Sequence, residues 1–422
     1  MMQRRHFLHC SACASAATII GCDDPMTLPL LDAGSTDATG ALDAPRTDAG
    51  SDAGSDAGSD AGSDAGSECD DVFAGGTLLG VVPFVGNDRP LELQSGRGWD
   101  GRLYTDLSTV PEEIVVPNET FYIRTLDPDR LDRSQEWRVE VSGLADAVSL
   151  TLDDLLTTGV RDMGMHVLEC SGNGGPSFGL MSAARWGGVP VMEVLDRLSI
   201  QPEATALEVS GFDDHSVPSA GGHSTPGAAW IFTFDQLAAA GAFFATEMNG
   251  LPLPENHGSP VRLYVPGWYG CSCIKWVDGL RFVDDSEPAT SQMREFASRT
   301  AQPGTPTLAV DFRPASMDQS AMPVRVEKWE VGGEIVFRIY GILWGGSTPT
   351  DELILGWGGD GQQRVETCPP QTMNAMWTVW QSAWRPSRTG EFSLRLRIED
   401  DSIPTNRLDT GYYGRVVDVD EI

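Results

Sequence analysis

One short stretch organises the rest of this sequence: residues 165–177 read MHVLECSGNGGPS. An apolar run ends at Cys170, and a glycine-rich turn begins directly after it. Because short apolar runs predict strands and glycine clusters predict turns, we expect the Cys170 thiol at the mouth of a strand rather than inside a core. Side chains at such positions are placed to do chemistry.

Cys170 alone has three interpretations. It can be a small buried hydrophobe, which is common for free cysteine. It can be a nucleophile, but a nucleophilic thiol needs a base, and His166 on the same strand face would lie far along that strand. It can also be a metal ligand, because a thiolate is a soft donor. A second motif has to decide between them.

The second motif lies further along the chain. Residues 247–262 read EMNGLPLPENHGSPVR, residues 266–270 read PGWYG, and Lys275-Trp276 follow. Together with the Cys170 stretch, these residues resemble the sulfite oxidase family of molybdopterin-dependent oxidoreductases. Residues 137–144, WRVEVSGL, and residues 150–155, LTLDDL, are similar to the opening strand and helix of that family. The resemblance runs from about Phe121 to the end of the chain.

The resemblance implies a cofactor and a set of site residues. Molybdenum would be held by a pterin dithiolene, with Cys170 as the metal ligand from the protein. The residues implied to bind the cofactor are Arg124, Cys170, Asn173, Asp213, His257, Arg262 and Lys275. The residues implied to be catalytic are Cys170, Arg124 and Arg185. Basic side chains in the motif would offset the negative charge of the pterin phosphate.

The implied reaction is oxygen-atom transfer at a mononuclear molybdenum centre, coupled to electron transfer to an external acceptor. The cofactor would supply the redox chemistry, and the protein would orient it and set the charge around it. Two alternatives stay open. The protein could be a reductase of a sulfoxide or N-oxide, or a cofactor-free, surface-anchored binding protein.

Several positions depart from the family pattern. The sulfite enzymes of the family carry arginine five residues after the cysteine, where this chain has Gly175, and their active-site tyrosine falls near Phe296. A charge-assisted hydrogen bond contributes about 1.5–3 kcal/mol, so the loss at Gly175 predicts weak capture of sulfite and a less charged or larger substrate. Arg397 matches roughly the place from which the family sends an arginine back to the active site. It could compensate, as could Arg124 or Arg185.

Two domains are expected after residue 71. Short β-rich runs with helical patterns at residues 150–157, 191–198 and 234–240 predict an α+β domain over residues 72–305, the catalytic domain. Residues 392–399, FSLRLRIE, alternate strictly and predict an all-β, immunoglobulin-like sandwich over residues 306–422, the C-terminal domain. This part resembles the family's dimerisation domain, so we expect a homodimer. Its tryptophans at 344, 357, 377, 380 and 384 are expected in the core and at an interface.

The first 22 residues predict export. Residues 3–9 read QRRHFLH, and a short apolar run closes at Ile20-Gly21-Cys22. This resembles a twin-arginine (Tat) signal that ends in a bacterial lipobox, with Cys22 as the lipidated residue. The run is too short to span a membrane. We therefore expect a periplasmic or cell-surface protein that a lipid anchors to a membrane.

Residues 23–71 predict a disordered tether. They hold 13 acidic residues and one basic residue, and Ser-Asp-Ala-Gly repeats from Ser51 to Gly66. A segment with few large apolar side chains and many repelling charges has no means of forming a core. The chain as a whole has a net charge of −32, which disfavours binding to nucleic acid because phosphates need a basic surface.

The cysteine pattern is consistent with export and with a thiolate ligand. Beyond residue 22 the cysteines are odd in number, which fits one of them being held by metal in an oxidising compartment: Cys69, Cys170, Cys271, Cys273 and Cys368. Cys271 and Cys273 alternate along the chain and are poorly placed to pair with each other. No Cys-x-x-Cys-His motif for c-type haem is present, so electrons are expected to leave to a separate carrier such as a cytochrome c.

Overall fold

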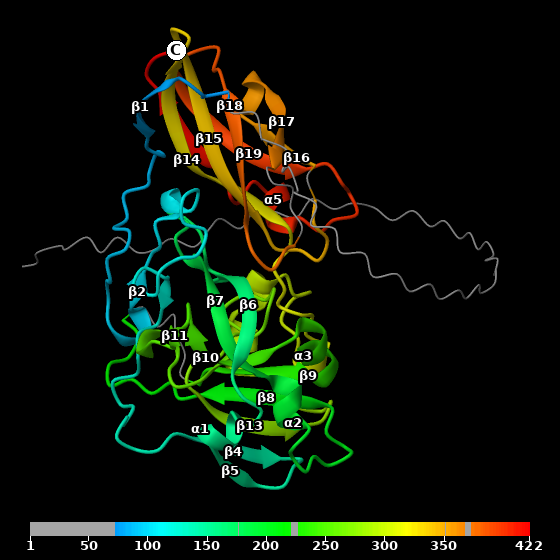
Figure 1. The fold of residues 1–422 in the computed structure, drawn as a ribbon. Helices are drawn as coiled ribbons and strands as arrows, with labels where there is room; N and C mark the ends of the chain where they lie inside the picture. The colour runs from blue at the N-terminus through cyan, green and yellow to red at the C-terminus, as the bar shows by residue number, and fades with distance from the viewer. Residues whose placement is uncertain (1–71, 176, 221–226, 351, 368–372) are drawn as a thin grey trace, which may run out of the picture. The chain divides into compact units, whose positions relative to one another are not determined.

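The computed structural model describes residues 72–422 apart from residues 176, 221–226, 351 and 368–372 (Figure 1). The predicted signal with Cys22, the acidic tether, Cys69 and Cys368 lie outside the described residues. In the described ranges, none of the helices is both long and apolar enough to cross a membrane.

Two five-stranded sheets build the catalytic domain. The first has the order β11-β10-β7-β6, with β12 also paired to β10 (Figure 1). Its strands are β6 (Arg161–Glu169), β7 (Met181–Pro190), β10 (Phe243–Met248), β11 (Leu251–Pro252) and β12 (Arg262–Tyr264). Adjacent strands are antiparallel, and Gly188 on β7 permits close pairing because a Cβ there would stand 2.3 Å from the Phe244 carbonyl oxygen.

The second sheet has the order β5-β4-β13-β8-β9. Its strands are β4 (Arg138–Gly143), β5 (Val148–Thr151), β8 (Ala206–Gly211), β9 (Ala229–Thr233) and β13 (Val277–Val283). Strands β4 and β13 are parallel, whereas the other pairs are antiparallel. A two-stranded sheet joins β2 (Arg102–Leu103) to β3 (Ile123–Arg124). Mixed sheets with few helices confirm the predicted α+β class.

The helices of the catalytic domain are short, and all of them except α2 begin at a threonine side-chain cap. They are α1 (Leu152–Leu155), α2 (Val191–Leu195), α3 (Phe234–Ala240) and α4 (Ser291–Glu295). Thr151 and Thr233 each form a capping box, with Asp154 and Gln236 respectively. These caps satisfy main-chain N–H groups of the first turn and define where the helix starts. All three predicted helices are present, and α1 is shorter than residues 150–157 because β5 extends to its cap, Thr151.

A single path of eight strands builds the C-terminal domain, in the order β1-β14-β15-β18-β17-β16-β19-β20. Strand β14 contacts β19, and β1 contacts β20, so the path folds back on itself. The strands are β1 (Thr77–Val82), β14 (Ser320–Val331), β15 (Glu334–Trp344), β16 (Leu353–Gly356), β17 (Gln362–Thr367), β18 (Thr378–Trp384), β19 (Gly390–Ile398) and β20 (Arg415–Val419). On β19 every second residue from Phe392 is buried, as the alternation predicts.

Strand β1 corrects the predicted domain boundary. Residues 72–305 were assigned to the catalytic domain, but Thr77–Val82 pairs antiparallel with β14 of the C-terminal domain. The physical reason is that β14 offers an open edge of main-chain N–H and C=O groups, and a strand can fill that edge from anywhere in the chain. Residues Thr77–Val82 therefore belong to the sheet of the C-terminal domain.

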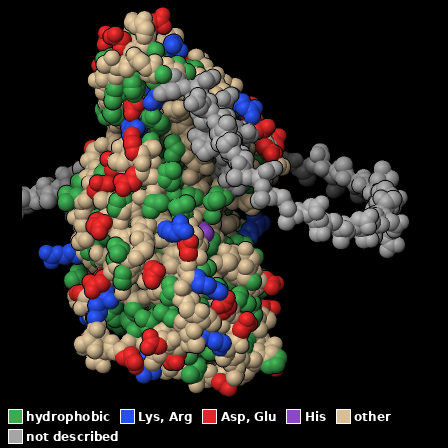
Figure 2. Space-filling model, in the orientation of Figure 1, with side chains coloured by type: hydrophobic (Ala, Val, Ile, Leu, Met, Phe, Trp, Pro, Cys, Tyr) green, Lys and Arg blue, Asp and Glu red, His purple; other side chains and the backbone are tan. Residues whose placement is uncertain are grey.

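Tryptophans join the core and the contact between the domains. Trp344, Trp377, Trp380 and Trp384 are buried, whereas Trp357 is only partly buried. The Trp377 indole donates a 2.9 Å hydrogen bond to the Ile114 carbonyl oxygen in the catalytic domain. On the face shown in Figure 2, acidic and basic side chains are interspersed over the lower part of the molecule.

Candidate active site

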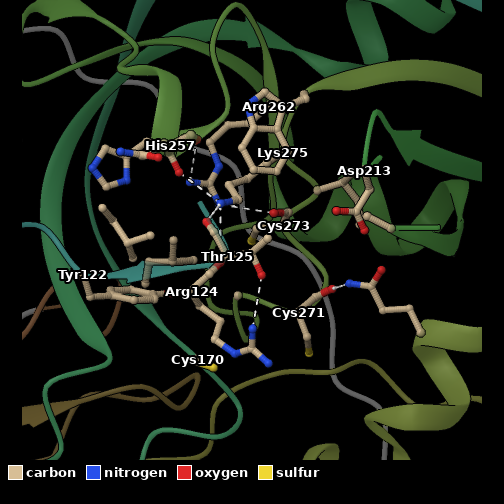
Figure 3. Close-up of a pocket in the computed structure, with 18 of the residues that line it drawn as sticks. Tyr122, Arg124, Thr125, Cys170, Asp213, His257, Arg262, Cys271, Cys273 and Lys275 are labelled. Carbon is tan, nitrogen blue, oxygen red and sulfur yellow. Dashed lines mark hydrogen bonds between the residues drawn. The ribbon is translucent and has the colours of Figure 1, made fainter. Parts of the chain in front are cut away.

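The two motifs meet in one pocket. Its lining includes Cys170 from the first motif and His257, Arg262 and Lys275 from the second. The open volume of the pocket, with the solvent at its mouth included, is about 940 Å³. Figure 3 shows Cys170 at one end and the three basic side chains gathered at the other.

Cys170 lies directly after β6, as predicted. Its main-chain N–H donates to the Leu180 carbonyl oxygen at 2.9 Å, which holds the turn against the start of β7. The Gly172 N–H lies 3.4 Å from the Cys170 sulfur, in position to donate to a thiolate. His166 does not line the pocket and bonds instead to the Met163 carbonyl oxygen. His166 is therefore not placed to activate Cys170 as a nucleophile.

Arg124 reaches the same end of the pocket from β3. Its guanidinium donates to the Trp99 carbonyl oxygen at 2.9 Å, and in Figure 3 it lies beside the Cys170 sulfur. The next residue, Thr125, has a φ of 76°, which is uncommon for a β-branched residue. This conformation turns its carbonyl oxygen to the Lys275 ammonium group at 2.6 Å. Thr125 thus connects Arg124, at the Cys170 end of the pocket, to Lys275 at the other end.

The basic end of the pocket is a buried cluster of His257, Arg262 and Lys275. Lys275 donates to the Thr125 and Asn256 carbonyl oxygens, and Arg262 donates to the His257 and Cys273 carbonyl oxygens. The Arg262 guanidinium also lies 5.5 Å from the centre of the Trp186 ring. Main-chain oxygens therefore orient these side chains, and Asp213, which lines the same pocket, offsets part of their positive charge.

The pKa values of the cluster record this excess of positive charge. Burial, followed by repulsion from Lys275 and Arg262, lowers the pKa of His257 to about 3. Burial and Arg262 hold the pKa of Lys275 well below its ordinary value, although Asp213 acts in the opposite direction. A bound anion would relieve this repulsion.

The residues present fit a molybdopterin cofactor. Arg262 Nε is buried and has no hydrogen-bond partner among the described residues, so a donor is available for an external phosphate oxygen. Cys170 supplies a soft sulfur ligand at the other end of the pocket. In the described ranges, no three His, Cys, Asp or Glu side chains come together as a metal site. A metal bound through Cys170 would therefore need further ligands from a cofactor.

Two other cysteines line the pocket without pairing. Cys271 and Cys273 are free and buried, and they do not pair with each other, as their spacing predicts. Burial raises the pKa of Cys271 to about 12 and raises that of Cys273 as well. Both remain neutral thiols at physiological pH.

Two predicted site residues are not in the pocket. Arg185 is exposed on β7 and forms an ion pair with Asp162. Side chains alternate along a strand, and Arg185 faces outward while Ala184 and Trp186 face the core. Asn173 is buried behind the Cys170 turn, where its side chain bonds to Glu169 and to the Leu180 N–H. It shapes the turn and does not line the pocket.

The arginine that returns from the C-terminal domain is Arg407, not Arg397. Arg397 is exposed and pairs with Glu399 on the same strand. Arg407 lies on α5 (Asn406–Asp409), and its guanidinium donates to the Ser171 carbonyl oxygen at 2.7 Å. The strand alternation favoured Arg397, whereas a short helix between β19 and β20 gave no periodic signal. Only the contact with the Ser171 carbonyl oxygen in the structure identifies Arg407.

A positively charged side chain from another segment lies near Gly175. Arg89 Nη2 lies 3.7 Å from the point where a Cβ at position 175 would stand. Phe296 lines the pocket, as the alignment with the family's tyrosine suggested. A guanidinium thus lies near the turn from a different segment of the chain, and weak capture of sulfite stays a prediction.

Comparisons with known proteins agree with this geometry. Residues 126–291 match the family described as the oxidoreductase molybdopterin binding domain. Mitochondrial sulfite oxidase of Rattus norvegicus is 27% identical over 353 residues, which cover 74% of this chain and 60% of that protein. A nitrate reductase [NAD(P)H] of Betula pendula is 28% identical over 177 residues, covering 39% of this chain and 20% of that protein. This chain thus spans less than two thirds of either relative.

The fold is also shared with a solved structure. The sulfane dehydrogenase SoxCD from Paracoccus pantotrophus matches with a TM-score of 0.58 and 19% identity, over 79% of this chain and 90% of that chain. Residues 126–291 are therefore a molybdopterin-binding domain of an oxidoreductase, and the chain is similar to sulfite oxidases over most of its length.

Proposed function

We propose that this protein is a molybdenum-dependent oxidoreductase that transfers an oxygen atom to or from a small substrate at the Cys170 end of the pocket. A single observation carries the proposal. One pocket holds a thiol at one end and a buried cluster of basic side chains at the other. Molybdopterin has complementary groups, because it joins a metal-binding dithiolene to an anionic phosphate. Electrons would leave to an external acceptor such as a cytochrome c.

The residues of the chain divide the work of binding the cofactor. His257, Arg262 and Lys275 would hold the phosphate, where the anion offsets their mutual repulsion. Cys170 would ligate the metal, and the Gly172 N–H stabilises the thiolate that this requires. Bound in this way, the cofactor supplies two-electron redox chemistry at the metal. Arg124 would hold negative charge beside the sulfur.

Export and assembly complete the proposal. The arginine pair of residues 3–9 and the Cys22 lipobox support delivery through the Tat pathway to a lipid-anchored position in the periplasm or on the cell surface. The resemblance of the C-terminal domain to a dimerisation module supports a homodimer. Light scattering at micromolar concentration should then give twice the mass of one chain.

The test is a metal and activity measurement on the full chain, purified from a host that has Tat export and pterin synthesis. We expect about one molybdenum per chain, and oxygen-atom transfer with artificial electron carriers. Cys170→Ser should retain the fold and much of the pterin but lose turnover. Cys273→Ser is the matched control, since it makes the same change in the same pocket and should retain turnover.

Each other outcome identifies an alternative. Activity only in the reductive direction, on a sulfoxide or N-oxide, would favour the reductase. A protein that contains neither metal nor pterin would favour the cofactor-free binding protein. Full activity of Cys170→Ser would show that this thiol is not the ligand.

A further inference from the structure

Another cavity lies apart from the pocket that contains Cys170. It is formed where β1 and the residues after it meet the C-terminal domain, and among the described residues none lines both cavities. Its open volume, with the solvent at its mouth included, is about 590 Å³. Apolar side chains such as Phe84, Leu107 and Val324 form much of its wall. The cavity can therefore cover the apolar part of a small molecule.

Arg415 brings a buried positive charge into this cavity. It lies on β20 at a position that faces the core, as Val417 and Val419 do, and it is only 5% exposed. Its guanidinium carbon lies 4.0 Å from the centre of the Phe84 ring and 5.4 Å from that of Phe178. Aromatic rings attract a cation without accepting conventional hydrogen bonds, so the N–H groups of Arg415 stay available to an acceptor.

The charge of Arg415 has no partner in the described part of the chain. Arg415 forms no ion pair there, and burial lowers its pKa to about 10 with no carboxylate acting in the opposite direction. Arg325 also lines the cavity, but it is already paired with Glu112 and Glu327. Asp106 contributes one negative charge to the wall, so a ligand with two negative charges would be repelled. The wall therefore matches a ligand with a single negative charge.

Two neutral polar groups lie in the same wall. The Ser177 hydroxyl and the side-chain oxygen of Asn87 are buried, and neither has a hydrogen-bond partner among the residues that the structure describes. Ser177 directly precedes Phe178, and the Asn87 N–H donates to the Phe84 carbonyl oxygen at 3.3 Å, so both belong to segments that contact Arg415. Burying such groups without a partner is costly, which indicates a polar ligand.

Main-chain contacts hold the segment that closes the cavity. The Val85 N–H donates to the Val416 carbonyl oxygen at 2.8 Å, and Phe84 forms an antiparallel bridge with Val417. Strand β1, directly before this segment, pairs with β14. The residues after β1 are thus fixed against β20 beside Arg415, and the wall is a defined part of the fold.

We propose that this cavity binds a small organic monocarboxylate, which receives hydrogen bonds from the Arg415 guanidinium and the Ser177 hydroxyl while the apolar wall covers its body. A guanidinium matches a carboxylate through two parallel N–H···O bonds. The ligand is not the substrate of the proposed reaction, because Cys170 and the basic cluster line the other pocket. The inference therefore does not depend on the proposed function.

The test is calorimetric titration of the full chain with sodium benzoate, compared with benzamide and sodium sulfate at constant ionic strength. Benzoate carries one carboxylate on an apolar ring, benzamide has nearly the same shape without the charge, and sulfate is an inorganic dianion. We expect about one benzoate to bind per chain. The dissociation constants of benzamide and sulfate should be at least about tenfold higher, the effect of losing one charge-assisted hydrogen bond.

Variants locate the binding site. Arg415→Gln should raise the benzoate dissociation constant by about tenfold to a hundredfold, and Ser177→Ala by about twofold to tenfold, because the hydroxyl donor is neutral. Arg415→Lys should recover part of the affinity, since it restores the charge without the planar fork. Arg388→Gln is the matched control: Arg388 lies 4.2 Å from the centre of the Phe392 ring but pairs with Asp360 outside the cavity, so benzoate binding should not change.

Three results would overturn the inference. One is the absence of saturable benzoate binding to the wild type, and another is equal affinity for benzoate and benzamide. The third is sulfate binding as tight as benzoate binding, because the cavity would then select inorganic anions. If Arg415→Gln does not fold, Ser177→Ala decides, and a benzoate affinity equal to that of the wild type in Ser177→Ala would contradict the site.

Discussion

Arg407 on α5 donates a 2.7 Å hydrogen bond from Nη2 to the main-chain oxygen of Ser171, the residue after Cys170. The same guanidinium donates to the Arg299 carbonyl oxygen at 2.8 Å and lies 3.7 Å from the buried Glu169 carboxylate. The Arg407 side chain of the C-terminal domain therefore contacts both neighbours of Cys170 in the chain, Glu169 and Ser171. The position of the turn depends on the docking of the two domains.

Replacing this arginine should loosen the turn and destabilise the protein. Arg407→Met removes the hydrogen bonds to Ser171 and Arg299 and leaves Glu169 without its cation. We expect the free energy of unfolding to fall by about 1.5–3 kcal/mol, as for hydrogen bonds that involve a charged group. Urea unfolding measures this, and Arg397→Gln, which breaks an exposed pair with Glu399, should change it by less than about 1 kcal/mol.

A double-mutant cycle with Glu169 tests whether the two charges act together. Glu169→Leu alone should cost about 3–5 kcal/mol, because it leaves a partly buried arginine without its carboxylate. The double variant Glu169→Leu/Arg407→Met should cost less than the sum of the two single changes. If the two losses in free energy of unfolding add up in the double variant, Glu169 and Arg407 do not stabilise each other.

The stability of the cofactor-free protein should depend on pH through His257. The pKa of His257 is about 3 in the folded chain, against an ordinary value of 6.5. Between these values the unfolded chain binds a proton that the folded chain does not, so stability decreases as pH falls from about 6.5 towards 3. The slope from this one group approaches about 1.4 kcal/mol per pH unit.

His257→Asn removes this titration while keeping a side chain able to bond to the Asn118 carbonyl oxygen. The free energy of unfolding of the variant, measured by urea at a series of pH values, should fall less steeply than that of the wild type between pH 6.5 and 3. Parallel curves would show that His257 is protonated equally in both states.

The Cys170 turn should not tolerate a side chain at Gly174. A Cβ there would stand 2.4 Å from the Tyr412 hydroxyl oxygen, which donates a 2.7 Å hydrogen bond to the Asn173 carbonyl oxygen. Gly174→Ala should therefore lower the free energy of unfolding by about 1–3 kcal/mol, the usual cost of overpacking. Thermal unfolding measures this, and adding Tyr412→Phe should recover part of the loss because it removes the obstructing oxygen.

Lipidation at Cys22 remains a prediction. Cys22→Ser should release the protein from membranes into the soluble fraction of the periplasm, because a lipid chain is the proposed anchor. Cell fractionation followed by immunoblotting measures the distribution. A variant that stays in the membrane fraction would contradict the lipobox interpretation.

Local patterns in the sequence predicted much of the fold and one face of the site. The apolar run that ends at Cys170 forms β6, the alternation over residues 392–399 forms β19, and the three helical patterns form helices. Such patterns are predictive because each element must bury one face, and the spacing of apolar residues records that requirement directly. The basic end of the pocket was predicted for a similar reason, since His257, Arg262 and Lys275 lie within one continuous motif.

What the sequence alone determined is therefore the position of Cys170 at the end of a strand, the basic cluster and the class of each domain. Tertiary structure alone decided which arginines lie beside the Cys170 turn: Arg89, Arg299 and Arg407 come from segments far apart in the chain. It also decided that β1 completes the C-terminal sheet and that Arg185 faces away from the pocket. A long guanidinium side chain leaves no periodic trace of where it reaches, because its contacts depend on how distant segments pack rather than on its neighbours in sequence.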